Sequence, residues 1–209
     1  HKFLNDKQIL EIRYHNKIYR IKLNLIGKIQ IKNILMAILA AHKSGLKFRK
    51  VINIIHKLKS VEGRLEKIGN IKNNSKVVLD YAHTPEALKL ALVSLKEQFP
   101  MSKISLVFGC GGDRDFKKRS IMGKIAEKYS DKIYLTDDNP RNENPKTIRN
   151  QLLKYVSKDK AYNIGNRKLA IKKAIHNAAP QELILVAGKG HEAKQIYKNK
   201  VLKISDKQI

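Results

Sequence analysis

The chain has 209 residues, 42% of them hydrophobic, which is enough to bury the core of one full domain and part of a second. Its 44 Lys and Arg residues outnumber its 18 Asp and Glu residues, giving a formal charge of +26. One cysteine excludes an internal disulfide framework, and no apolar stretch reaches the ~20 residues of a membrane helix. We expect a cytoplasmic protein without membrane insertion. Because the sequence starts at His1, we expect a piece of a longer protein.

The positive charge allows two interpretations. A surplus of this size is usual for nucleic-acid binders. The lysines are nevertheless spread along every segment beside Ile and Asn, without a basic block, and only 6% of residues are aromatic. We therefore attribute the charge to compositional drift and expect no nucleic-acid partner, and a basic nucleic-acid-binding module stays as an alternative.

The first part of the chain predicts strands followed by two helices. Residues Tyr14 to Leu25 alternate loosely and favour strands. A helix is predicted from Ile31 to His42 and should stop at Gly45, and its apolar face comprises Ile31, Ile34, Leu35, Ile38 and Leu39. A second amphipathic helix has an apolar face of Val51, Ile52, Ile55 and Leu58. Lys59 to Arg64 shows no periodicity, so we place a domain boundary between residues 62 and 63.

The second part alternates strands and helices. Continuous apolar runs predict buried strands at Val77–Leu79, Ile104–Phe108, Ile133–Leu135 and Leu183–Val186. One helix should begin with Thr84 as its N-cap and Pro85 in its first position, and Asn144–Pro145 repeats this start signal. This alternation predicts an α/β fold with a mostly parallel sheet and helices on both faces.

Four polar loops follow the predicted strands. In open parallel sheets, ligands bind at the carboxyl ends of the strands. We therefore expect the loops to share one edge of the sheet and to form a site. The loops are Asp80–Pro85, Gly109–Asp115, Thr136–Arg141 and Gly188–Glu192.

Two of these loops have both a functional and a structural interpretation. The glycines of Gly109–Asp115 allow a ligand to approach the backbone closely, but the loop also fits a plain connection in which Asp113 or Asp115 caps the next helix. The loop ending at Arg141 offers a guanidinium to a carboxylate, but it also fits an Asx-type turn with a solvated arginine.

The other two loops are equally ambiguous. Gly188–Glu192 suggests phosphate binding, but no Gly-Lys-Ser or Gly-Lys-Thr triplet occurs, so a Walker-type phosphate loop is absent from the sequence. We expect His83 and His191 to be structural and predict no metal site. Asp80 is placed to bind a ribose hydroxyl beside a helix N-terminus, or it acts only as a cap, as Thr84 also does.

Taken together, the motifs resemble the Mur ligase family. Within it, they are similar to the branch that adds meso-diaminopimelate to UDP-MurNAc-L-Ala-D-Glu in peptidoglycan biosynthesis. The resemblance runs from about Asn24 to Asp206. It rests on Glu62-Gly63-Arg64-Leu65-Glu66, Asp80–Pro85, Gly109–Asp115, Asp138–Arg141 and Gly188–Glu192.

The resemblance implies a domain organisation. Residues 1–62 would end a central ATPase domain, and residues 63–209 would form a Rossmann-like C-terminal domain that binds the amino acid. The catalytic residues, the phosphate loop and the groups that hold ATP and Mg²⁺ are expected upstream of His1. The isolated chain should therefore be inactive, and we expect a monomer.

The resemblance also implies a reaction and site residues. ATP would phosphorylate the glutamyl carboxylate, and the incoming amine would attack the acyl phosphate. The expected diaminopimelate-binding residues are Arg114, Asp138, Asn139, Arg141, Gly188 and Glu192, and Arg64, Asp80 and His83 are expected on the nucleotide side. The alternative within this class is a related Mur or folylpolyglutamate-type ligase for another amino acid, against which Asn139-Pro140-Arg141 argues.

Overall fold

The computed structural model describes residues 1–209 except for the side chain of Lys72. The chain divides into two compact units, one formed by residues 1–61 and 94–100 and the other by residues 62–93 and 101–209. Among the described residues, no helix has the length and apolarity needed to cross a bilayer.

The first unit combines a small antiparallel sheet with two helices. Leu10, Ile21 and Leu23 of the sheet and Ile34, Ile38 and Ile52 of the helices belong to one buried apolar core. The Phe48 ring stacks on Tyr14 with 3.9 Å between centroids. The elements are β1 (Lys2–Leu4), β2 (Lys7–Tyr14), β3 (Lys17–Leu23), α1 (Lys28–Lys43) and α2 (Phe48–Ile55), with the strands in the order β1-β2-β3.

The predicted strand region of this unit is interrupted by a turn. β2 ends at Tyr14, and His15 and Asn16 adopt φ values of 43° and 56° before β3 begins. Left-handed conformations at both positions suit a two-residue hairpin, and asparagine tolerates them better than most residues. β1 and most of β2 were not predicted, because their polar and charged residues obscure the alternation.

The predicted helices are present with two corrections. Gly45 ends α1 as expected, with φ of 93° and a hydrogen bond of 3.1 Å from the Leu46 N–H to the Ala41 carbonyl. Leu39 was assigned to the buried face, but its side chain is 55% exposed. Leu58 was assigned to the second helix, but α2 ends at Ile55 and Leu58 is 40% exposed.

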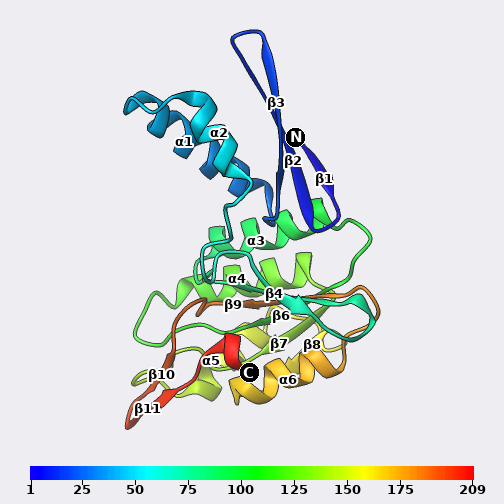
Figure 1. Ribbon diagram of the computed structural model, residues 1–209. Helices are drawn as coiled ribbons and strands as arrows, with labels where there is room; N and C mark the ends of the chain where they lie inside the picture. Colours follow the sequence, from blue (N-terminus) through cyan, green and yellow to red (C-terminus); the bar gives the residue numbers. More distant parts are fainter. The chain divides into compact units, whose positions relative to one another are not determined.

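The second unit contains a six-stranded sheet with strand order β4-β5-β9-β6-β7-β8 (Figure 1). β4 runs antiparallel to β5, and every other neighbouring pair is parallel. The strands are β4 (Glu66–Asn70), β5 (Lys76–Asp80), β6 (Ile104–Phe108), β7 (Lys132–Leu135), β8 (Ala161–Asn163) and β9 (Leu183–Ala187).

Helices cover both faces of this sheet, as the sequence predicts. Ala170, Ile171 and Ala174 of α6 pack against Val107 and Tyr134 on one face. α3 and α4 lie on the other face (Figure 1). Thr84 and Asn144 accept backbone N–H groups at the starts of α3 and α5, so both predicted helix starts are confirmed. The helices are α3 (Pro85–Gln98), α4 (Lys117–Tyr129), α5 (Pro145–Leu153) and α6 (Arg167–His176), and short 3₁₀ turns lie at Lys72–Asn74 and Asp206–Gln208.

Four strands of this unit were not predicted. β4 and β8 are partly exposed and contain charged or polar residues, so their sequences form no continuous apolar run. β10 (Lys194–Tyr197) and β11 (Lys200–Lys203) form a separate lysine-rich hairpin. An isolated bridge between Arg141 and Tyr197 links this hairpin to the loop after β7.

The register of the parallel strands places their carboxyl ends together. Asp80 pairs with Ala187 at the ends of β5 and β9, and Phe108 pairs with Leu135 at the ends of β6 and β7. The loops that follow these four strands therefore lie along one edge of the sheet, as predicted. We call the four loops Asp80–Pro85, Gly109–Asp115, Thr136–Arg141 and Gly188–Glu192 the carboxyl edge.

A buried ion pair lies beneath this edge. The Arg167 Nε and Nη2 atoms donate to the two Asp206 carboxylate oxygens at 2.8 and 2.6 Å, and neither side chain is exposed. Arg167 Nη2 also donates to the Ala187 carbonyl at 3.0 Å. The pair therefore connects the start of α6, the end of β9 and the C-terminal segment.

Replacing Arg167 with leucine should destabilise the second unit by about 3–5 kcal/mol, because Asp206 would stay buried without its partner. Native-state hydrogen exchange at the β9 amides measures this loss. Lys207→Met is the control, because Lys207 is 43% exposed and its pairs with Glu62 and Glu66 lie at the surface. Equal β9 protection in the two variants would contradict the prediction.

Candidate functional site

Backbone hydrogen bonds join the loops of the carboxyl edge in pairs. The Gly188 N–H donates to the Asp80 carbonyl at 3.1 Å, and the Gly112 N–H donates to the Asn139 carbonyl at 2.9 Å. Side chains link the pairs, because Glu192 accepts hydrogen bonds from both Tyr81 and Asn139. The four loops thus form one connected structure.

The glycines of the second loop are required by the neighbouring protein backbone. A Cβ on Gly109 would lie 2.1 Å from the Thr136 carbonyl oxygen, and one on Gly112 would lie 1.9 Å from the Pro140 carbonyl oxygen. The sequence suggested that these glycines allow a ligand to approach. At these two positions, the group that approaches is the loop after β7.

Buried Arg119 fastens the same two loops together. Its guanidinium donates to both Glu143 carboxylate oxygens at 2.8 Å and to the Gly111 carbonyl at 3.2 Å. Glu143 in turn accepts the Asp113 N–H at 2.7 Å. Asp115 accepts the Lys117 N–H at the start of α4, which agrees with its structural interpretation.

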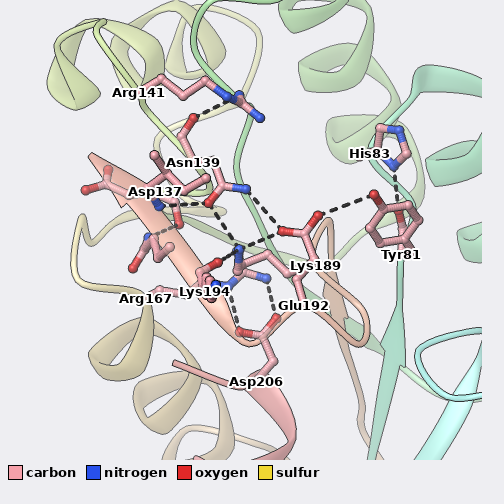
Figure 2. A network of polar contacts seen from close by, with 12 residues as sticks. Tyr81, His83, Asp137, Asn139, Arg141, Arg167, Lys189, Glu192, Lys194 and Asp206 are labelled. Carbon is pink, nitrogen blue, oxygen red and sulfur yellow. Dashed lines mark hydrogen bonds and ion pairs between the residues drawn. The ribbon is translucent and has the colours of Figure 1, made fainter. Parts of the chain in front are cut away.

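A polar network occupies the centre of the edge (Figure 2). Lys189 is fully buried, and its ammonium donates to Asn139 Oδ1 at 3.2 Å, to Glu192 Oε2 at 3.0 Å and to the Lys194 carbonyl. Asn139 Nδ2 donates to Glu192 Oε2 at 3.1 Å. The Glu192 side chain is 34% exposed, so its carboxylate faces this network on one side and solvent on the other.

Asp138 lies in the same region with one oxygen unsatisfied. Its side chain is 8% exposed, and the buried Oδ2 atom has no hydrogen-bond partner. A Cβ on Gly188 would lie 2.7 Å from that oxygen, and Gly188 has φ of 112°. Both the conformation and the space therefore require glycine at position 188.

The two predicted arginines both approach Gly111. A Cβ on Gly111 would lie 2.9 Å from Arg141 Nη1 and 3.9 Å from Arg114 Cγ. Arg141 is half-buried, with φ of 53°, and its Nη1 donates to the Gly112 carbonyl at 2.8 Å and to the Asn139 carbonyl at 3.3 Å. Arg114 is exposed. Two arginine side chains therefore lie at one end of the carboxyl edge, and the Arg141 guanidinium is the group next to Gly111.

Tyr81 lies at the centre of the predicted nucleotide side. The Arg64 guanidinium stacks 4.8 Å from the ring centroid, and the rings of His83 and His191 lie 4.6 and 5.4 Å away. The Tyr81 hydroxyl donates to Glu192 Oε1 at 3.3 Å. One side chain thus contacts both the predicted nucleotide side and the predicted amino-acid side.

Asp80 is engaged by the backbone. Its carboxylate oxygens accept the Leu65 and Ala82 N–H groups, each at 2.8 Å. Burial raises the pKa of Asp80 above its usual value, although these two hydrogen bonds oppose the shift. Asp80 therefore shapes the start of its loop whether or not it also contacts a ligand.

The electrostatics favour an ionised Glu192. Burial alone would raise the pKa of its carboxyl, but the hydrogen bond and charge of Lys189 and the hydrogen bonds from Asn139 and Tyr81 hold that pKa below its usual value.

Cys110, in the second loop, is 3% exposed and lies 3.6 Å from Met122 Sδ. Burial raises the pKa of its thiol to about 12.

The structure brings most of the predicted amino-acid-binding residues together. Asp138, Asn139, Gly188 and Glu192 surround the Lys189 network, and Arg141 and Arg114 both approach Gly111. In the structure the Asn139 amide bonds to Lys189, Glu192 and the Ile196 N–H. Its side chain thus helps to position neighbouring groups, and its contact with diaminopimelate stays a prediction.

Sequence reasoning missed the residues that hold the edge together. Lys189 belongs to a motif noted for its glycines, and Tyr81 to one noted for Asp80. Both motifs signalled a site, but a sequence does not tell which side chains are buried. Arg119 lies inside a helix and resembles any other basic residue of this lysine-rich chain.

A protein-family model matches most of the segment that contains the carboxyl edge. A family model described as "Mur ligase, glutamate ligase domain" matches residues 63–190, more than half of the chain. The chain belongs to the Mur ligase family. The match contains the first three loops and the start of the fourth, Gly188 to Gly190.

Curated Mur ligases extend this similarity to nearly the whole chain. The UDP-N-acetylmuramoyl-L-alanyl-D-glutamate--2,6-diaminopimelate ligase of Rickettsia montanensis is 43% identical over 203 residues, which cover 97% of this chain and 42% of that protein. The ligase of the same name from Buchnera aphidicola is 46% identical over 186 residues, covering 88% and 36%. The chain thus spans about two fifths of the length of these relatives.

Solved structures agree with the fold. A structure of UDP-N-acetylmuramoyl-L-alanyl-D-glutamate--2,6-diaminopimelate ligase matches with a TM-score of 0.70 and 30% identity, covering 95% of this chain and 40% of that one. Folylpolyglutamate synthase of Mycobacterium tuberculosis matches with a TM-score of 0.69 and 20% identity, covering 90% and 43%. This second similarity shows the fold alone.

Acidification should release the glycine-rich loop through Glu143. The hydrogen bond from Arg119 holds the pKa of Glu143 below its ordinary value of 4.5, although burial opposes the shift. The stabilisation is therefore complete above the unfolded-state pKa and is lost as the pH falls through the lowered folded-state pKa. An NMR titration of the Asp113 N–H should show a midpoint below the ordinary glutamate value of 4.5.

Arg119→Met should move this midpoint upward, because Glu143 would lose its guanidinium partner. Lys117→Met is the matched control, since exposed Lys117 starts the same helix without contacting Glu143. A midpoint at or above the ordinary value of 4.5 in the unmodified chain would refute the assignment.

Proposed function

We propose that this chain is the C-terminal part of an ATP-dependent ligase that adds meso-diaminopimelate to UDP-MurNAc-L-Ala-D-Glu in peptidoglycan biosynthesis. Residues 1–62 end the central ATPase domain, and residues 63–209 form the domain that binds the amino acid. Family membership, and the relatives that carry this activity in their names, support the proposal.

The observation that carries the proposal is the charge arrangement of the carboxyl edge. Arg141 places a guanidinium group beside Gly111, the Cγ atom of Arg114 reaches the same glycine, and Glu192 places a partly exposed carboxylate at the centre of the edge. Diaminopimelate carries two carboxylates and two amines. A site that binds it selectively needs fixed donors for a carboxylate and an acceptor for an ammonium group.

The residues of this chain act by binding and orientation. Arg141, supported by Arg114, holds a carboxylate of the amino acid, and Glu192 holds the ammonium group of the same end. This fixes the other amine for attack on the activated glutamyl carboxyl group, and such positioning lowers the barrier without a catalytic group in the domain. Gly188 leaves room for Asp138 at the floor of the site.

ATP and Mg²⁺ belong to the rest of the proposed ligase. The sequence contains no phosphate loop, and among the described residues no group of three or more His, Cys, Asp or Glu side chains is placed to hold a metal ion. Arg64 and His83, which both lie against the Tyr81 ring, line the nucleotide side. The proposed enzyme works in the cytoplasm as a monomer.

The 209-residue chain alone should show no ATP-dependent ligase activity, whereas a longer chain that includes the upstream domain should be active. The reason is that the phosphate loop lies outside this chain. A colorimetric assay of phosphate release, run on both proteins with all three substrates present, tests this. Robust turnover by the 209-residue chain would refute this division between the domains.

Arg141 should discriminate diaminopimelate from lysine, which lacks the second carboxylate. Losing a charge-assisted pair in a partly desolvated site costs on the order of 2–5 kcal/mol, equivalent to roughly 30-fold to several-thousand-fold discrimination. In the longer ligase, Arg141→Ala should therefore raise the KM for diaminopimelate sharply and leave the KM values for ATP and the UDP substrate nearly unchanged. Steady-state kinetics with both amino acids tests this.

Arg141→Lys is the informative comparison, because lysine keeps the charge but loses the planar pair of donors. Its KM should lie between those of the unmodified enzyme and the alanine variant. Equal use of lysine and diaminopimelate by the unmodified enzyme would reject the assigned selectivity, even if the ligase reaction itself were observed.

A further inference from the structure

Lys189 is a buried cation that the mechanism above does not use. Its side chain has no exposed surface, yet it lies directly beneath the partly exposed carboxylate of Glu192. Burying an ammonium group is costly unless every N–H has an acceptor. The three acceptors of Lys189 satisfy its three donors, and they belong to Asn139, Glu192 and Lys194.

The Lys189 ammonium and a backbone N–H fix the orientation of the Asn139 amide. Its Oδ1 atom receives two donors, the Lys189 ammonium at 3.2 Å and the Ile196 N–H at 3.0 Å. The opposite orientation of the amide would place its NH₂ group against both donors. Asn139 must therefore direct its Nδ2 atom toward Glu192, where the hydrogen bond measures 3.1 Å.

Glu192 is held by the same network. Its Oε2 atom receives both Lys189 and Asn139, and its Oε1 atom receives the longer hydrogen bond of 3.3 Å from the Tyr81 hydroxyl. Oxygen Oε1 therefore keeps acceptor capacity. Lys189 and Asn139 thus hold the carboxylate in one orientation through Oε2, and the partly exposed side chain keeps Oε1 available to a further donor.

Lys189 also fixes the shape of the fourth loop. Its ammonium donates to the Lys194 carbonyl, which joins the loop after β9 to the first residue of β10. Because the same ammonium also binds Asn139, this loop cannot shift relative to the loop after β7 without breaking a hydrogen bond of a buried charge.

We propose that Lys189 is a specificity-determining positioning residue, which sets the orientation of Asn139 and Glu192 so that Oε1 of Glu192 is presented to the ammonium group of the incoming amino acid. This deepens the proposed function and rests on it for the identity of the ligand. Lys189 touches no substrate, and it acts entirely through the two side chains above it.

The first experiment needs no activity and uses the 209-residue chain. A ¹³C NMR titration follows the Glu192 carboxyl group in the unmodified chain, in Lys189→Met and in Lys189→Gln. Methionine removes both the charge and the donors, and glutamine keeps a donor. The pKa of Glu192 should rise by about one unit or more in the methionine variant, and by less in the glutamine variant.

Lys194→Met is the matched control, because it removes one positive charge from the start of β10, five residues further along the chain, and leaves the Lys194 carbonyl in the network. Its Glu192 pKa should change by less than about 0.3 units. An unchanged pKa in a folded Lys189→Met chain would overturn the proposal. If that variant does not fold, an unchanged pKa in Lys189→Gln overturns it equally.

The second experiment measures kinetics in the longer ligase. Lys189→Met should raise the KM for diaminopimelate about 10-fold or more, while kcat stays within about threefold and the KM for ATP is unchanged. A decreased KM for diaminopimelate would overturn the proposal, because it would mean that Lys189 only neutralises Glu192. Absence of ligase activity in the unmodified protein would contradict the proposed function, and the NMR result would still decide the role of Lys189.

Discussion

The backbone of the glycine-rich loop lies directly against the backbone of the loop after β7, and no Cβ fits between them at Gly109 or Gly112. These two loops carry Arg114 and Arg141, and Arg119 braces them from beneath the surface. The spacing of the backbone positions that carry the two arginines is therefore set by contact between two main chains. Such contacts vary little, because a main chain has few freely rotating bonds and the interior is close-packed. The backbone of the site is therefore preorganised before any ligand arrives.

Much of the fold could be predicted because its strongest signals are local. Continuous apolar runs identified β5, β6, β7 and β9, and Thr84 and Asn144 identified the starts of two helices. The location of the site followed from one topological rule, that parallel strands align their carboxyl ends. The lysine-rich β10 and β11 gave no such signal, because their residues are largely exposed.

What could not be predicted depends on long-range partners. Arg167 and Asp206 are 39 positions apart, and Lys189 meets Asn139 across 50 positions. The sequence shows many basic residues, but not which few are buried with matching acceptors. The contacts of Asn139 with Glu192 and of Asp80 with the Leu65 N–H were not predicted for the same reason, since these partners lie in other segments. A buried lysine or arginine needs several acceptors and so connects several segments. Which residues are buried depends on the whole fold and cannot be read from the local sequence.

The interior also gives an account of the chain's charge. Carboxylates are scarce, and several of them neutralise buried cations, as Glu143 does for Arg119 and Asp206 for Arg167. Each such pair removes one charge of each sign, so the whole excess of positive charge is left to the other residues, and attraction between them and any polyanion should weaken steeply with salt.

The buried sulfur of Cys110 makes the chain its own reporter of local opening. It is the only thiol in the sequence, and it lies inside the loop that carries Arg114. With a pKa near 12, only about one molecule in 10⁵ carries the reactive thiolate at pH 7. Alkylating reagents will therefore modify the folded chain only when this loop leaves its place between β6 and α4. The rate of Cys110 labelling, followed by mass spectrometry, therefore measures how often this loop opens.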